Sequence, residues 1–93
     1  MSEKIRGSYT RTFKLPVTTQ AVQLVAKDSK RARLIVYNNG SATVYILSAQ
    51  NMTTSDGIPV AAGTSYTNDT TTAELYIVAA SGTQDVRVQV DGN

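Results

Sequence analysis

Apolar and polar residues alternate with a period of two along most of the chain, and this pattern predicts β-strands. The last clear segment shows it best, because Val86, Val88 and Val90 share one face while charged and amide residues occupy the other. Such alternation is typical of a sheet with one solvated side. Strands are expected over 20–26, 33–37, 43–47, 58–60, 64–67, 74–79 and 85–90. Their spacing predicts an all-β fold, a small antiparallel β-sandwich or a jelly-roll-like barrel of about six to eight strands.

Two pairs of consecutive strands are predicted to form hairpins. The strands at 33–37 and 43–47 are joined through the sequence Asn-Asn-Gly-Ser, whose residues tolerate the positive φ of tight hairpin turns. The strands at 74–79 and 85–90 are joined through Ser-Gly-Thr. Each link is short enough for its two strands to lie side by side in one sheet.

The sequence also predicts where two of the strands lie in their sheets. Leu75 and Ile77 alternate with Tyr76 and Val78, so both faces of this strand are apolar and it is expected to be central. Pro59 cannot donate a hydrogen bond to a neighbouring strand, and it therefore predicts an edge.

Residues 1–16 differ from the rest, because charged and polar residues interrupt their apolar positions. The chain is therefore divided into an extended N-terminal arm, residues 1–16, and a β-sandwich domain, residues 17–93. One interpretation of the arm is a disordered terminus; the other is a segment that becomes ordered on a partner's surface. Under the second interpretation, its binding residues are Lys4, Arg6, Tyr9, Arg11, Phe13, Lys14 and Leu15.

The residue types present argue against catalysis. The chain has no Cys and no His, which removes disulfides, the usual zinc ligands and the commonest general base. The carboxylates at 56, 69, 74, 85 and 91 fall mostly in turns or on the polar faces of strands. No glycine-rich phosphate loop and no dense set of oxygen ligands is present. We therefore expect no enzyme activity, no cofactor and no metal site.

Charge is distributed unevenly. Residues 1–33 hold eight of the nine Lys and Arg residues, and residues 34–93 hold five of the seven acidic ones. A basic segment can contact nucleic acid, an acidic protein surface, or only solvent. The densest basic cluster, at Lys27, Lys30, Arg31 and Arg33, has no aromatic residues interleaved, so nucleic acid is not the expected partner.

Chain length and hydropathy bear on assembly and location. A domain of 93 residues buries only roughly 60 to 65% of the surface of its unfolded chain, so oligomerisation or docking is expected to add stability. No apolar run is long enough for a membrane helix, and the first sixteen residues are charged where a signal peptide is apolar. Synthesis in the cytoplasm, with no membrane partner, is the expectation.

Part of the sequence resembles small virion proteins of tailed bacteriophages. In that pattern a strand ending in Asn-Asn-Gly-Ser, as at 33–41, leads to a Val-Tyr strand, as at 44–47, and then to a Gly-Ile-Pro segment, as at 57–60. The segments 75–79 and 85–88 are similar to its final hairpin. The resemblance covers about residues 31–90, and its motifs are turn and core residues.

The resemblance implies a non-enzymatic structural protein, namely a head-decoration (cement) protein that binds the major capsid protein on the exterior of the phage head and stabilises it. Decoration proteins commonly form trimers, so a homotrimer is the preferred state. The arm would then contact neighbouring capsid subunits. The alternative is an adhesion or receptor-binding module of a fibre or tail that recognises a host-surface glycan. Against this alternative, the chain has no Trp to serve as an aromatic platform, only Tyr.

Overall fold

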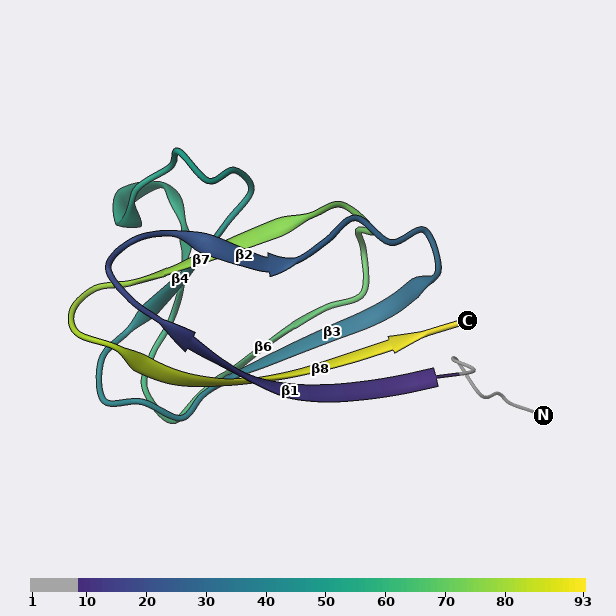
Figure 1. Ribbon diagram of the computed structural model, residues 1–93, viewed down its shortest axis with the longest axis horizontal. Helices are drawn as coiled ribbons and strands as arrows, with labels where there is room; N and C mark the ends of the chain where they lie inside the picture. Colours follow the sequence, from purple (N-terminus) through teal and green to yellow (C-terminus); the bar gives the residue numbers. More distant parts are fainter. Residues whose placement is uncertain (1–8) are drawn as a thin grey trace.

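The computed structural model describes residues 9–93, which form eight β-strands and almost no helix (Figure 1). This confirms the predicted all-β sandwich. The strands are β1 (Tyr9–Val17), β2 (Val22–Val25), β3 (Arg31–Asn38), β4 (Val44–Leu47), β5 (Ile58–Val60), β6 (Ser65–Asn68), β7 (Leu75–Ala79) and β8 (Gln84–Gly92), with a 3₁₀ turn, η1 (Thr54–Asp56), before β5.

The strands form two antiparallel sheets, one above the other. The first sheet has the order β1-β8-β3-β6 and the second has the order β2-β7-β4-β5. Every consecutive pair of strands changes sheet except β4 and β5, which are neighbours in the second sheet. This is jelly-roll topology. β7 is central and β5, which holds Pro59, is an edge strand, as the sequence predicted.

Both predicted hairpins are wrong, because their strands belong to different sheets. β3 lies in the first sheet and β4 in the second, and β7 and β8 are divided in the same way. Among residues 9–93, positive φ occurs only at Gly63 and Gly82, so the Asn-Asn-Gly-Ser link does not form the tight turn expected of it. Each link is instead an arch that carries the chain over the edge of the core.

Two buried polar side chains hold the link between β3 and β4 in its arch. Asn38 is fully buried; its Nδ2 donates to the carbonyls of Ala42 and Val60 at 2.8 and 2.9 Å, and its Oδ1 accepts from the Gly40 N–H at 3.0 Å. From β8, the Oε1 of Gln84 accepts from the N–H groups of residues 41 and 42 at 2.7 and 3.0 Å. These bonds satisfy backbone groups that a hairpin would have paired between its strands.

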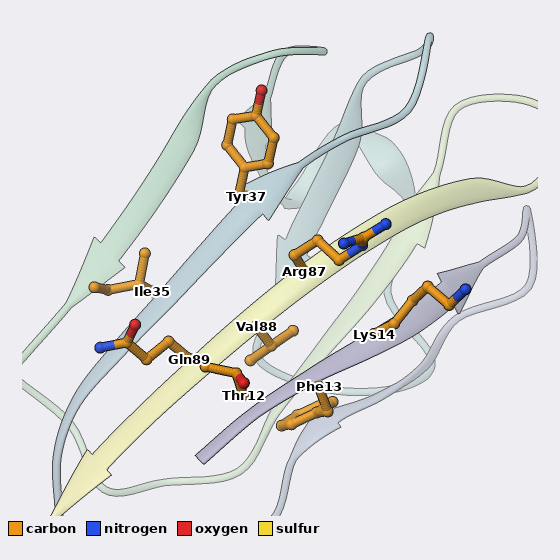
Figure 2. A pocket seen from close by; sticks show the side chains of 8 residues that line it. All are labelled: Thr12, Phe13, Lys14, Ile35, Tyr37, Arg87, Val88 and Gln89. Carbon is orange, nitrogen blue, oxygen red and sulfur yellow. The ribbon is translucent and has the colours of Figure 1, made fainter. Parts of the chain in front are cut away.

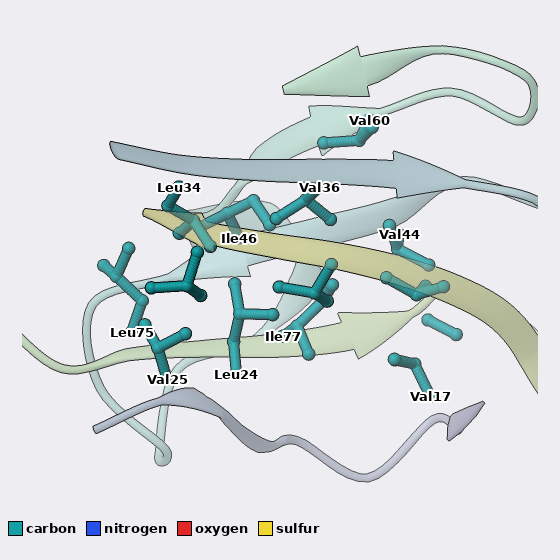
Figure 3. Close-up of a cluster of buried hydrophobic side chains, with 14 residues drawn as sticks. Val17, Leu24, Val25, Leu34, Val36, Val44, Ile46, Val60, Leu75 and Ile77 are labelled. Atoms are coloured by element: carbon teal, nitrogen blue, oxygen red, sulfur yellow. The ribbon is translucent and has the colours of Figure 1, made fainter. Parts of the chain in front are cut away.

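The core fills the space between the sheets (Figure 3). Because side chains alternate along a strand, each strand sends every second residue inward. The alternation predicted for the last strand is confirmed, since its three valines are at most 2% exposed. The core comprises Val17, Leu34, Val36, Val86, Val88 and Val90 from the first sheet and Leu24, Val25, Val44, Ile46, Val60, Leu75, Ile77 and Ala79 from the second.

The boundary predicted for the arm is also wrong. Residues 9–16 are part of β1, which pairs with β8 over nine consecutive residues from Tyr9↔Gly92 to Val17↔Gln84. The apolar residues of β1 explain the difference, because Tyr9, Phe13 and Leu15 pack against the core and gain from being in the sheet. Residues 1–8 of the predicted arm lie outside the described residues.

The outer face of the second sheet is covered by the chain itself. Leu47 and Val78 point away from the main core, yet they are only 1% and 5% exposed. The segment between β4 and β5 provides the cover: Gly57 lies so close to the sheet that a Cβ there would be 2.7 Å from the Leu47 side chain and 2.9 Å from Tyr45. In the described part of the chain, the outer face of the first sheet has no comparable cover.

Candidate binding face

Two rows of side chains cross the outer face of the first sheet, and we call them together the binding face. Strand register determines both rows. The first row contains Lys14, Arg87 and Tyr37, because Arg87 is paired with Lys14 on one side and with Tyr37 on the other. The second row contains Thr12, Gln89 and Ile35, held by the same two strand pairings.

The binding face is hollowed into a shallow groove of about 490 Å³ (Figure 2). Both rows line it, together with Phe13 and Val88. Tyr37 is 40% exposed, which is unusual for a large aromatic side chain in the middle of a sheet. The groove therefore combines an aromatic ring and an aliphatic side chain with amide, hydroxyl and cationic groups, as sites for small polar ligands do.

Two ion pairs on this side of the sheet leave little net charge. Arg87 bonds Asp85 through two nitrogens at 2.9 and 2.8 Å. Arg33 bonds the Oδ2 of Asp91 in the same way, at 3.0 and 2.8 Å. Lys14 belongs to neither of the two ion pairs found among residues 9–93. The face thus carries one more cation than anions, which is too little positive charge to favour a polyanion.

The Asp85 carboxylate is held ionised by its neighbours. Hydrogen bonds from Arg87 first, and then from Asn39, lower the pKa of Asp85 from 3.8 to about 2. The same pairing raises the pKa of Arg87. The guanidinium therefore stays charged and in a fixed position beside Tyr37 across the whole physiological pH range.

The Asp85–Arg87 pair predicts how stability changes in acid. A carboxyl whose pKa is lower in the folded state stabilises the protein above its unfolded value, and this contribution is lost as the pH falls through the folded value. We therefore expect a constant melting temperature above about pH 5 and a decline between 3.8 and about 2. Thermal melts across this range should show a smaller decline for Asp85→Asn and an unchanged one for Asp56→Asn; equal declines in all three proteins would contradict the prediction.

The structure separates the residues that the sequence assigned to a binding arm. Lys4 and Arg6 lie outside the described residues. Tyr9 lies against Gly92 and donates a 2.7 Å hydrogen bond to Asp28.

Arg11 sits over the ring of Phe13, 5.3 Å from its centroid, and Phe13 and Leu15 are half-buried against the core. Of the described residues that the sequence assigned to binding, Phe13 and Lys14 line the groove. The remaining described arm residues hold β1 in place.

The basic cluster at 27–33 is largely used inside the fold. Arg31 is 6% exposed, and its guanidinium donates to the carbonyls of Ala26, Thr71 and Ala73. Arg33 is paired with Asp91. Two of the four cations therefore serve the structure, which leaves only two lysines exposed to solvent.

Sequence reasoning missed Tyr37, Ile35 and Gln89 as site residues. A signal was present for the first two, because they occupy the alternate positions of β3 that point away from the core residues Leu34 and Val36. Apolar residues on both faces of a strand indicate either two buried faces or one exposed apolar patch. Which of these holds depends on whether another segment covers the outer face, and the strand's own residues do not encode that.

The described residues also show no feature of a metal site or a membrane span. Residues 9–93 contain no cluster of three or more acidic side chains placed to hold a metal ion. Within the same residues, no helix has the length and apolarity needed to cross a bilayer.

Comparison with known proteins shows a likeness in structure to a phage protein. No protein-family model matches the sequence, and no curated protein matches it. The fold is similar to the stem and receptor-binding domain of the spike protein P1 from bacteriophage PM2, with a TM-score of 0.64 and 16% sequence identity. The likeness shows a shared fold. It covers 88% of this chain and 33% of that chain, so this chain spans about a third of the spike structure's length.

Proposed function

We propose that this chain is a non-enzymatic module of a bacteriophage virion. Its binding face would bind a glycan on the host surface and so attach the virion to the host. The observation that carries the proposal is the exposed Tyr37 in the groove of an otherwise uncovered sheet. The likeness to a phage spike domain supports an adhesive role over a purely structural one.

The chemistry of the groove suits a saccharide. Sugars present apolar C–H faces that stack on aromatic rings and hydroxyl groups that bind amides and guanidinium groups. Tyr37 of β3 provides the ring. On the neighbouring strand β8, Arg87 lies in the same row as Tyr37, and Gln89 lies in the other row. Arg87 is already oriented by Asp85, so little side-chain entropy is lost on binding. A nearly balanced charge favours a neutral or weakly acidic glycan.

Capsid decoration is the second candidate, favoured by the sequence resemblance over residues 31–90. In this role the chain would bind the assembled major capsid protein and stabilise the shell, because it binds the lattice and not the separated subunits. A truncation to test it must stop at residue 8, since removing residues 9–15 would take away most of β1. Loss of capsid binding on removal of residues 1–8 would support this candidate.

Replacing Tyr37 tests the glycan proposal. We expect Tyr37→Ala to weaken binding to an array of bacterial surface polysaccharides by about tenfold or more, equivalent to roughly 1.4 kcal/mol, because the stacking surface is removed. Tyr37→Phe keeps the ring and should retain most of the affinity. Tyr76→Ala, on the other sheet, is the matched control and should bind as the unmodified protein does.

Two results would contradict the glycan proposal. The first is an array on which the unmodified protein binds no polysaccharide. The second is equal binding by Tyr37→Ala and Tyr76→Ala, which would place any glycan site elsewhere. Binding to phage capsids without any glycan binding would favour the decoration role.

A further inference from the structure

The two lateral sides of the sandwich differ in a complementary way. One side, which we call the basic side, is formed by the edge strands β1 and β2; the other, the acidic side, is formed by the edge strands β5 and β6. Residues 9–28 contain Arg11, Lys14 and Lys27 and one acidic residue, Asp28, which accepts the hydrogen bond from Tyr9. Residues 48–73 contain Asp56 and Asp69 and no Lys or Arg. The uneven charge along the sequence thus becomes an uneven charge across the molecule.

Each lateral side also carries incompletely buried apolar residues. On the basic side, Phe13, Leu15 and Val22 are partly exposed at the margin of the core. On the acidic side, Ile58 is 55% exposed, the most exposed large apolar residue in the described chain, and Tyr66 is partly exposed. Apolar surface at the centre of an interface with charges around it is the usual composition of a protein–protein contact.

Both sides also end in strands that have a sheet partner on one side only. Among the described residues, β1 pairs with β8 alone and β6 pairs with β3 alone. An edge strand presents a row of backbone N–H and C=O groups that can pair with another chain. At β1 this row extends over nine residues.

From these three observations we propose that copies of this chain associate head to tail, with the basic side of one copy against the acidic side of the next. The partner is a second copy of this chain, because the chain carries both the basic side and the acidic side that the contact requires. A contact between two different surfaces of identical copies gives a ring if the rotation closes and a filament if it does not. The assembly would leave the centre of the binding face exposed, because Tyr37 and Arg87 lie on the inner strands β3 and β8, and only the β1 residues of that face also belong to the basic side.

Charge reversal provides the test, with solution mass measured by light scattering on the full chain. The unmodified protein is expected to form oligomers that weaken as salt rises. Arg11→Glu removes two units of positive charge from the basic side, and Asp69→Arg removes the net negative charge of the acidic side, so each weakens the attraction and should lower the association constant by about tenfold or more. The double variant carrying both changes should associate no more tightly than either single variant, since its acidic side keeps no net charge. Glu74→Arg, at the start of central β7, is the matched control and should associate normally.

Replacing Ile58 tests the apolar part separately. Ile58→Ser should weaken association without weakening the fold, because the side chain is exposed in the single copy. A monomeric full chain at high protein concentration and low salt would overturn the proposal. So would oligomers that Arg11→Glu, Asp69→Arg and Ile58→Ser all leave unchanged. Glycan binding is measured on a different face, so the proposed function can fail while this inference holds, and the reverse is equally possible.

Discussion

Replacing Arg31 by Met is expected to lower the free energy of unfolding by about 2–4 kcal/mol. Arg31 opens β3, and its Nη atoms donate to Ala26 at 3.0 Å, to Thr71 at 3.2 Å and to Ala73. These bonds connect the loop after β2 to the loop before β7. Met fills a similar volume but donates nothing, so three carbonyl groups lose charge-assisted partners together. In a chain of this size the melting temperature should fall on the order of 10–20 °C.

The neighbouring Lys30 is the matched control for this prediction. It is exposed, and none of the side-chain hydrogen bonds described above involves it, so Lys30→Met should change stability by less than about 0.5 kcal/mol. Arg31→Lys should be intermediate, because an ammonium group cannot reach three carbonyls in the geometry of a guanidinium. If Arg31→Met and Lys30→Met unfolded at the same urea concentration, the structural role assigned to Arg31 would be wrong.

Asn38→Ala is expected to have an effect of similar size, about 2–4 kcal/mol. The change removes two donors and one acceptor from a fully buried position, so the Gly40 N–H and the carbonyls of Ala42 and Val60 lose the bonds that this side chain makes to them. The backbone of Asn38 also bonds Gly63 and Thr64 in the turn after β5. The loss of the side chain should therefore loosen both the β3–β4 arch and the adjoining edge of the second sheet.

Asn39 offers a control at the next position, because its side chain is exposed and bonds only Asp85. Asn39→Ala should cost less than about 1 kcal/mol in denaturant unfolding. Asn38 and Gln84 both bond the same arch, so their alanine variants are expected to be non-additive in a double-mutant cycle. Additive effects would show that the two side chains stabilise separate features.

The strands were predictable from sequence because their local pattern reflects a real difference between buried and exposed faces. Val86, Val88 and Val90 alternate with polar residues, and the structure buries all three valines. Pro59 identified an edge for an equally local reason, since it has no N–H to donate. β1 was missed as a strand because its charges hide the alternation of Tyr9, Phe13 and Leu15.

The pairing of strands could not be predicted in the same way. An arch and a hairpin can use the same short polar link, and both place apolar residues against a core. They differ in the hydrogen-bond partners of the link, which here include Gln84, forty-two residues from Ala42 along the chain. Gly40 shows the same dependence, because a Cβ at that position would meet the Gln84 side chain. No window of neighbouring residues contains this information.

The candidate site was harder to predict still. Lys14 was named from the sequence for its charge, and Tyr37 was known only as one tyrosine among several. Lys14 and Tyr37 lie in one row, on either side of β8, because Arg87 is the register partner of both. That register depends on how eight strands are ordered in two sheets, and the order of strands was beyond what periodicity could supply.

The pairing of β1 with β8 has a consequence for how the chain folds. β8 lies between β1 and β3 in the first sheet, yet it follows every other strand in the sequence. During synthesis, β1 and β3 must therefore wait, without their shared neighbour, until the ribosome has released residues 84–92. Closing such distant contacts is slow, typically milliseconds to seconds for β-sandwiches. The nascent chain exposes its apolar strand faces and unpaired strand edges for this time, and such surfaces favour aggregation until the last strand is in place.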